Sequence, residues 1–159
     1  MPELLDDGVT IARENPLGAD LVLLHARHTE AMHFDTPPES IHMLPADALV
    51  HPDIAFFVLR DAGQPLGMGA FKRLSPTHAE IKSMHILAEA RGRGLAQVML
   101  AHLVAEARAA GITRLSLETG AQPSFKAACR LYVAAGFEEC GPFEGYLDDP
   151  NSVFMTRLL

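Results

Sequence analysis

The spacing of hydrophobic and polar positions changes repeatedly along the chain, and these changes predict strands and helices in turn. Runs of β-branched and aromatic residues with two-residue alternation predict strands, and apolar residues three or four positions apart predict helices. The predicted strands are residues 9–13, 54–60, 65–74, 79–87, 114–119, 137–140 and 152–158. The predicted helices are residues 18–33, 94–110 and 123–135, with a shorter helix at 45–50. Hairpin-like strands followed by a strand–helix–strand unit predict one α/β domain over residues 1–159. We expect three layers, with a mixed, mostly antiparallel sheet of about seven strands covered by helices on both faces.

The strand at 79–87 carries several polar residues between apolar ones. Strict alternation would place Glu80, Lys82, Met84 and Ile86 on one face of the sheet. It would place Ile81, Ser83, His85 and Leu87 on the other face. We therefore expect Glu80 and His85 to point in opposite directions.

The composition is that of an ordinary globular protein, with 48% hydrophobic and 21% charged residues. The formal net charge is −7, and such a surface repels nucleic-acid phosphates. Nucleic acid is therefore an unexpected partner, and a cationic substrate is weakly favoured over an acidic one. A local pair of arginines can still bind an anionic cofactor.

Neither the cysteines nor the histidines form a metal-ligand pattern. Cys129 and Cys140 have no ligand or disulfide spacing, and His25, His28 and His33 have no further ligand motif beside them. We expect no metal. The acidic N-terminus does not resemble a signal peptide, and no apolar run reaches the length of a membrane span. These features predict a cytoplasmic protein without a membrane partner.

A glycine-rich loop, Arg91-Gly92-Arg93-Gly94-Leu95-Ala96, lies between a predicted strand and the longest predicted helix. Glycines allow the backbone to approach a ligand closely, and unpaired amides at a helix N-terminus attract anions. The loop lacks the Lys-Ser/Thr ending of a nucleotide-triphosphate loop and the spacing of a dinucleotide fingerprint. It predicts a phosphate-bearing ligand without naming it, and the alternative is a plain turn with solvated arginines.

Three ordered motifs resemble those of the GNAT superfamily of N-acetyltransferases. They are Arg91-x-x-Gly94-x-Ala96, Leu131-Tyr132-x-x-x-Gly136-Phe137, and Glu80 placed eleven residues before Arg91. The chain also resembles a narrower bacterial set of acetyltransferases of the YsnE type. The segments that carry this likeness are Ser40-Ile41-His42, Glu80-Ile81-Lys82-Ser83-Met84, Leu117-Glu118-Thr119-Gly120 and Asp149-Pro150-Asn151-Ser152-Val153-Phe154-Met155.

The resemblance implies an acyltransferase that uses acetyl-CoA as co-substrate. The loop would hold the diphosphate, and the backbone of the strand near Met84 would separate from its neighbour and pair with the pantetheine arm. The implied cofactor contacts are Met84, His85, Ile86, Arg91, Gly92, Arg93, Gly94, Leu95, Ala96, Phe125 and Tyr132. Phe125 stands where many family members have an asparagine that contacts the pantetheine, so that side-chain contact is in question here.

The resemblance also implies catalytic roles. Glu80 is the candidate base, acting directly or through a water, with Glu118 as the rival base or an anchor for the substrate ammonium. Tyr132 is the candidate acid that protonates the leaving thiolate, because its ordinary pKa is about 10. The Met84 N–H is the candidate donor to the thioester oxygen, and His42 is a weaker candidate on the acceptor side. Each side chain also has a plain structural interpretation, either solvated or packed in the core.

Three functional interpretations remain open on the sequence. The first is direct acetyl transfer in a ternary complex to a primary amine of a small or amino-acid-like molecule, with residues 36–44 as a lid. The second is acetylation of a protein lysine or N-terminus, and the third is a non-catalytic acyl-CoA-binding module. The Asp148-Asp149 pair is either a turn or a contact for the amine, and Val153 and Phe154 could support a homodimer.

Overall fold

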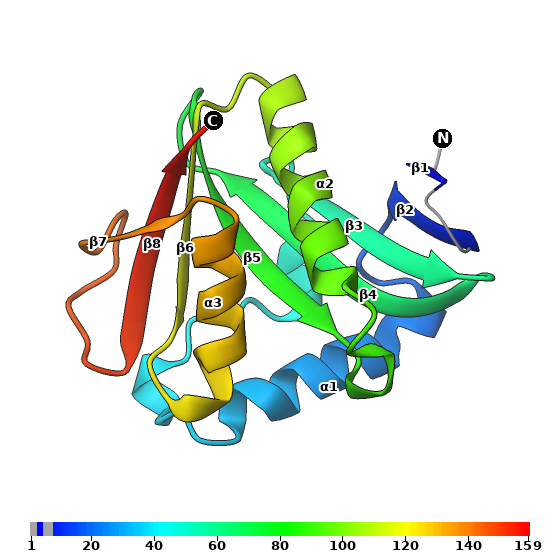
Figure 1. Ribbon diagram of the computed structural model, residues 1–159, viewed down its shortest axis with the longest axis horizontal. Coiled ribbons are helices and arrows are strands. Elements are labelled where there is room, and N and C mark those ends of the chain that lie inside the picture. Colours follow the sequence, from blue (N-terminus) through cyan, green and yellow to red (C-terminus); the bar gives the residue numbers. More distant parts are fainter. Residues whose placement is uncertain (1–2, 5–7) are drawn as a thin grey trace.

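A twisted sheet of eight strands forms the centre of the protein (Figure 1). The computed structural model describes residues 3–4 and 8–159; the rest of the acidic N-terminal segment, from which we expected no signal peptide, lies outside the described residues. The strands are β1 (Glu3–Leu4), β2 (Val9–Arg13), β3 (Ile54–Asp61), β4 (Gln64–Arg73), β5 (His78–Ile86), β6 (Arg114–Gly120), β7 (Glu138–Cys140) and β8 (Ser152–Leu158).

The strand order is β1-β2-β3-β4-β5-β6-β8-β7. Every neighbouring pair is antiparallel except β5 and β6, which are parallel. The predicted mixed and mostly antiparallel sheet is therefore confirmed. The additional strand is β1, whose two residues were too short a run to be predicted.

Three α-helices connect these strands: α1 (Val22–His33), α2 (Leu95–Ala109) and α3 (Lys126–Ala134). Short 3-10 turns are found at Ala19–Leu21, Pro38–Ser40, Ala46–Leu49, Ala88–Ala90 and Pro123–Phe125. The predicted helices at 18–33 and 123–135 thus each begin with a 3-10 turn. Gly111 and Gly136 follow α2 and α3 with φ of 84° and 92°, the left-handed conformation that commonly ends a helix.

The helices cover both faces of the sheet. At Gly69 of β4, a Cβ atom would lie 3.0 Å from Met99 of α2, so the absence of a side chain lets α2 pack closely. On the other face, the ring of His28 of α1 lies 5.3 Å from that of His85. Because His85 pairs with Met68, the neighbour of Gly69, α1 and α2 cover opposite faces. Figure 1 shows α2 and α3 crossing the near side of the sheet.

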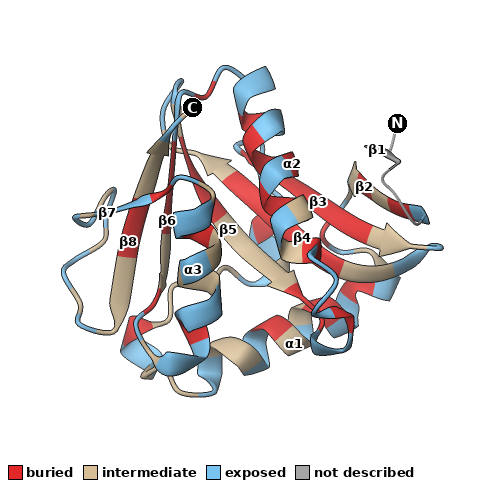
Figure 2. Cartoon of the chain, viewed as in Figure 1, coloured by how far each residue is buried: buried red, intermediate tan, exposed pale blue. Residues whose placement is uncertain are grey.

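The core is concentrated on the central strands β3, β4 and β5 and on the inward faces of the helices (Figure 2). Leu59, Met68, Met99, Leu103 and Leu115 are completely buried. Within the described residues, no helix is both long enough and apolar enough to cross a membrane.

Phe154 belongs to this packing as well. Its side chain is 4% exposed, and its ring packs on Phe143 and Tyr146. Val153 is half-buried and packs against the core. Both residues thus contribute to packing within their own chain, and the homodimer stays a prediction.

A bulge in β5 changes which side chains share a face. Every second residue of β4 points to the same face, as Lys72, Ala70 and Met68 do. Their partners on β5 are Glu80, Lys82 and His85, which therefore share that face. The extra residue lies at Ser83, whose φ is 54°. Beyond that point the alternation is shifted by one, as a bulge requires. The prediction that His85 points away from Glu80 is therefore wrong, because both lie on the face that α1 covers.

Candidate active site

The parallel strands β5 and β6 separate at the middle of the sheet. They pair only from His78–Arg114 to Glu80–Ser116, although β5 continues to Ile86 and β6 continues to Gly120. Figure 1 shows the two strands diverging toward α1. The predicted separation around Met84 is confirmed, and it opens a gap in the sheet where backbone groups of both strands lack strand partners.

A cavity of about 90 Å³ lies at this gap, and we call it the inner cavity. Six of the residues predicted for the site line it, drawn from five different segments of the chain. They are His42, Glu80, Met84, Glu118, Phe125 and Tyr132. The expectation that the ends of the strands carrying Glu80 and Glu118 open toward one cleft is thus confirmed. His28, Thr36, Ser40, Lys82, Ser83 and Tyr146 also line the cavity, and none of these was a predicted site residue.

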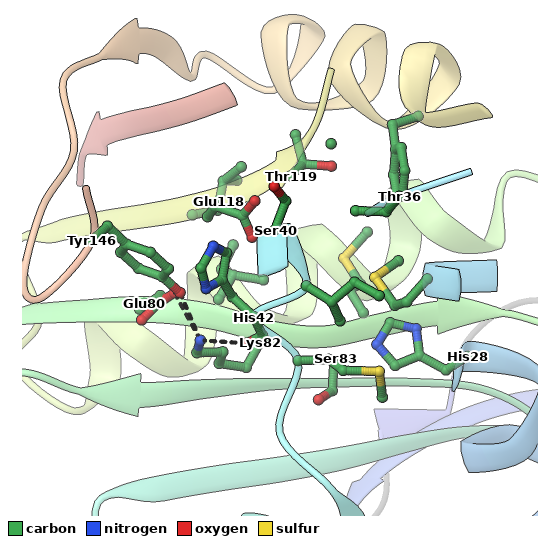
Figure 3. Close-up of a pocket in the computed structure, with 18 of the residues that line it drawn as sticks. His28, Thr36, Ser40, His42, Glu80, Lys82, Ser83, Glu118, Thr119 and Tyr146 are labelled. Atoms are coloured by element: carbon green, nitrogen blue, oxygen red, sulfur yellow. Dashed lines mark hydrogen bonds and ion pairs between the residues drawn. The ribbon is translucent and has the colours of Figure 1, made fainter. Parts of the chain in front are cut away.

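Tyr146 forms the most compact polar cluster of the cavity with two residues of β5 (Figure 3). Its hydroxyl donates to Glu80 Oε2 at 2.5 Å and accepts from Lys82 Nζ at 2.7 Å, while Lys82 Nζ lies 3.1 Å from the same carboxylate oxygen. Glu80 is only 4% exposed, and these two partners make the burial of its charge tolerable. Burial, followed by the charge of Glu80, raises the pKa of Tyr146 well above its ordinary value.

Tyr146 comes from the loop between β7 and β8, and it was missed because no spacing in the sequence connects it to β5. The only signal was indirect: it is one of two tyrosines in the chain and lies in the segment Phe143-Glu144-Gly145-Tyr146.

The segment that carries Ser40 and His42 meets the loop that carries Tyr146 and Asp149 beside this cluster. The ring of His42 lies edge-on to Tyr146 at 5.0 Å, and the carbonyl of His42 accepts a hydrogen bond from Lys82 Nζ at 3.3 Å. The hydroxyl of Ser40 donates to Asp149 Oδ2 at 2.5 Å, and this bond is the main cause that lowers the pKa of Asp149. Asp149 also accepts from the backbone N–H of Asn151, which supports the turn interpretation of this residue.

An outer vestibule of about 620 Å³ lies beyond these loops and shares His42, Glu80, Lys82 and Tyr146 with the inner cavity. Its further charged residues are mostly acidic: Glu39, Lys72, Glu144, Asp148 and Asp149. The predicted lid, residues 36–44, contributes to the lining of both spaces. The inner cavity therefore has an acidic approach on the side of these loops.

Glu118 faces the inner cavity from β6. Burial raises the pKa of its carboxyl group, and the opposing effects of Ser152, His42 and Lys82 are smaller. A carboxylate with a raised pKa accepts protons more readily near neutral pH, so Glu118 stays a rival of Glu80 for the role of base.

Tyr132 and Phe125 close the cavity on the side of α3. Tyr132 is 7% exposed, its ring lies edge-on to Phe137 at 5.8 Å, and burial raises its pKa above the ordinary value. The phenol is therefore protonated at neutral pH. Phe125 packs so closely on β6 that a Cβ at Gly120 would lie 2.2 Å from its ring. Both residues contribute to the core and to the cavity wall.

The glycine loop has the open backbone that an anion site requires. Gly92 and Gly94 have φ of 85° and 74°, and a Cβ at either position would meet nothing within 4 Å. No side chain of the described residues caps the N-terminus of α2, so the amides of its first turn are available to a ligand. Arg91 is exposed, whereas Arg93 is paired with Asp61 at 2.9 Å. The loop fits a diphosphate, with Arg91 as the more accessible of the two arginines.

His85 lies outside the lining of the inner cavity, although it is on the same face as Glu80. Burial, and then the charges of Arg91 and Arg27, lower its pKa to about 4. Among the residues that the structure describes, no group of three or more His, Cys, Asp or Glu side chains is placed to hold a metal ion.

Comparisons with known proteins agree with this geometry. The model of the Acetyltransferase (GNAT) family matches residues 20–137. The chain is 44% identical to the uncharacterized N-acetyltransferase YsnE of Bacillus subtilis, over 89% of this chain and 94% of that protein. It is 39% identical to the IAA acetyltransferase of Azospirillum brasilense, over 95% and 98% of the two chains. The resemblance to the YsnE type is therefore confirmed.

Solved structures share the fold. A candidate acyl-CoA N-acyltransferase from Klebsiella pneumoniae superposes with a TM-score of 0.76 at 28% identity, covering 97% of this chain and 99% of the other. YncA of Salmonella typhimurium, a candidate acetyltransferase solved with its cofactor acetyl-CoA, has a TM-score of 0.69 at 17% identity, covering 95% and 94%. Motifs, fold and relatives lead to one conclusion: the chain belongs to the GNAT family of acetyltransferases.

Proposed function

We propose that the protein transfers the acetyl group of acetyl-CoA directly to a primary amine of a small or amino-acid-like acceptor, within a ternary complex. The observation that carries the proposal is the gap between β5 and β6, where the cavity lined by Glu80, Glu118 and Tyr132 lies; beyond the gap, β5 leads along the chain to the uncapped N-terminus of α2. The bound acetyl-CoA in the structure of YncA and the names of the N-acetyltransferase relatives support this choice of donor and reaction.

On the donor side, we expect the diphosphate at the backbone amides of the 91–96 loop. The open space around Gly92 and Gly94 accommodates phosphate oxygens close to the main chain. Arg91 adds a positive charge. The pantetheine arm would then extend along the separated part of β5, where its amides can pair with free backbone groups.

The bulge supports the role proposed for the Met84 N–H. The β4–β5 ladder passes from Lys82–Ala70 directly to His85–Met68, so Ser83 and Met84 are left out of the pairing. A backbone donor that is outside the ladder and borders the cavity is suited to stabilise the oxygen of the thioester as it gains negative charge.

Proton transfers complete the reaction. The neutral amine attacks the thioester carbonyl carbon, and the C–S bond breaks as the amide bond forms. Glu80 or Glu118 takes the proton from the amine nitrogen, and Tyr132 donates its proton to the departing thiolate sulfur. In the described part of the chain, Oε1 of Glu80 has no hydrogen-bond partner, which leaves that oxygen able to receive the proton.

The closed loops favour a small acceptor over a protein chain. Ser40 and Asp149 join the two loops, and Tyr146 packs on His42 between the inner cavity and the vestibule. A peptide would need these contacts to open, whereas a small amine can pass through the vestibule.

The test is release of CoA thiol from acetyl-CoA with amino acids, polyamines, arylamines and peptides as acceptors. The proposal predicts acceptor-dependent release by the wild type and slower release by Glu80→Gln or Glu118→Gln, whichever residue is the base. Stabilisation by CoA without thiol release for any acceptor would identify a binding module instead. Activity restricted to peptides would favour the protein-acetylating alternative.

A further inference from the structure

Three polar atoms, each on a residue that lines the inner cavity, have no hydrogen-bond partner among the described residues. They are His28 Nδ1, Thr36 Oγ1 and Ser83 Oγ, and all three are shielded from solvent. His28 is the most deeply buried of these side chains, at 5% exposed. Buried polar atoms in folded proteins are nearly always hydrogen-bonded. Three exceptions around one cavity point to a ligand that supplies the missing partners.

These residues lie away from the cluster of Tyr146, Glu80 and Lys82. In Figure 3, His28, Thr36 and Ser83 lie on one side of the cavity and this cluster lies on the other, with Glu118 between them. Met32 and Met84 also line the cavity. The cavity therefore has a charged end, where an amine would react, and a neutral polar end beside flexible apolar side chains.

The neutral end carries no counter-charge for an ionic ligand group. Burial, and then the neighbouring His85 and His25, lower the pKa of His28 to about 3, so the imidazole is uncharged at neutral pH. A neutral imidazole offers one donor and one acceptor, and each hydroxyl can act as either.

The chemistry of the neutral end selects between ligand groups. A carboxylate or ammonium would lose its water there without gaining an opposite charge. A methyl group would leave all three polar atoms without partners. A hydroxyl or carboxamide can both donate and accept, and it requires no counter-ion.

We propose that the His28–Thr36–Ser83 end of the inner cavity is a subsite for an uncharged hydrogen-bonding group, a hydroxyl or carboxamide, on the amine acceptor. This inference rests on the proposed function, and it adds a substrate class: an amine that carries a neutral polar group at its far end. Sites built to hydrogen-bond a substrate group discriminate strongly against analogues that lack it.

The test compares acceptors of matched shape in the thiol-release assay. One set is 4-aminobutanamide, 4-aminobutyrate and 4-methylpentylamine, which differ only in a terminal carboxamide, carboxylate or dimethyl group. Homologous sets with shorter and longer carbon chains accompany it, and the set that is acetylated fastest is used. We expect kcat/KM for the carboxamide to exceed that of both partners by on the order of 100-fold.

Variants then connect the preference to the subsite. Thr36→Val and Ser83→Ala each remove one hydroxyl, and each should reduce the preference for the carboxamide by roughly tenfold through a higher KM. CoA affinity should stay unchanged in both. Thr29→Val is the matched control, because Thr29 is exposed on α1 and its hydroxyl bonds only the carbonyl of His25 in its own helix.

Each other result overturns the inference. Equal kcat/KM for the carboxamide and the dimethyl analogue, while acetylation proceeds, would refute the subsite and leave the proposed function standing. Weaker CoA binding in the variants with an unchanged acceptor preference would assign the polar atoms to the cofactor. A lower melting temperature without a change in preference would assign them to a structural water. No acetylation of any amine would refute the proposed function itself.

Discussion

Removal of one hydroxyl group tests how the buried carboxylate of Glu80 is held. Tyr146→Phe keeps the ring contacts with His42, Phe143 and Phe154 and removes only the atom that bonds both Glu80 and Lys82. A hydrogen bond to a charged group contributes about 1.5–3 kcal/mol. We therefore expect a loss of about 2 kcal/mol, or roughly 4–8 °C in melting temperature for a chain of this size.

Calorimetry and turnover measure the two consequences of this change separately. Without the hydroxyl, Lys82 becomes the sole partner holding Glu80 Oε2 among the described residues, and turnover should fall while CoA affinity is preserved. Tyr146→Leu, which also removes the ring contacts, should be less stable still. A Tyr146→Phe protein with unchanged melting temperature and unchanged turnover would refute the reasoning, since the cluster would then contribute neither stability nor catalysis.

Three further changes test other parts of the site. Gly94→Glu adds a carboxylate beside the α2 N-terminus and should weaken CoA binding by roughly 100-fold through charge repulsion, measured by titration calorimetry with Gly94→Ala as the uncharged control. Tyr132→Phe should lower turnover by about 100-fold with little effect on CoA affinity, as expected for loss of a general acid; an unchanged rate would exclude that role. Burial raises the pKa of Glu118 in the folded protein above its ordinary 4.5. The free energy of unfolding of the wild type therefore falls as the pH rises from the ordinary pKa to the raised one. Glu118→Gln should therefore gain stability relative to the wild type as the pH rises above 4.5, and a constant difference would contradict this assignment.

The element order could be predicted from the sequence because each strand and helix has its own local signature. Gly94, Gly111 and Gly136 mark helix ends by their chain position alone, and all three adopt the left-handed conformation there. The position of the glycine loop at the start of α2 was equally predictable, because it depends on consecutive residues and on the helix that follows.

The contacts between loops around the inner cavity could not be predicted in the same way. Tyr146 reaches Glu80 across 66 positions of sequence, and Ser40 reaches Asp149 across 109. No local pattern encodes such contacts. The bulge at Ser83 also escaped prediction, because a single inserted residue leaves the apolar pattern intact while it reverses the direction of every later side chain. That reversal is why His85 was placed on the wrong face.

The central claim is that the backbone between β5 and α2 binds the diphosphate of coenzyme A, and a structure of the complex with CoA tests it most directly. We predict phosphate oxygens about 3 Å from main-chain amides within residues 91–96, and the pantetheine arm between β5 and β6. Coenzyme A bound elsewhere, with that loop unoccupied, would contradict the account.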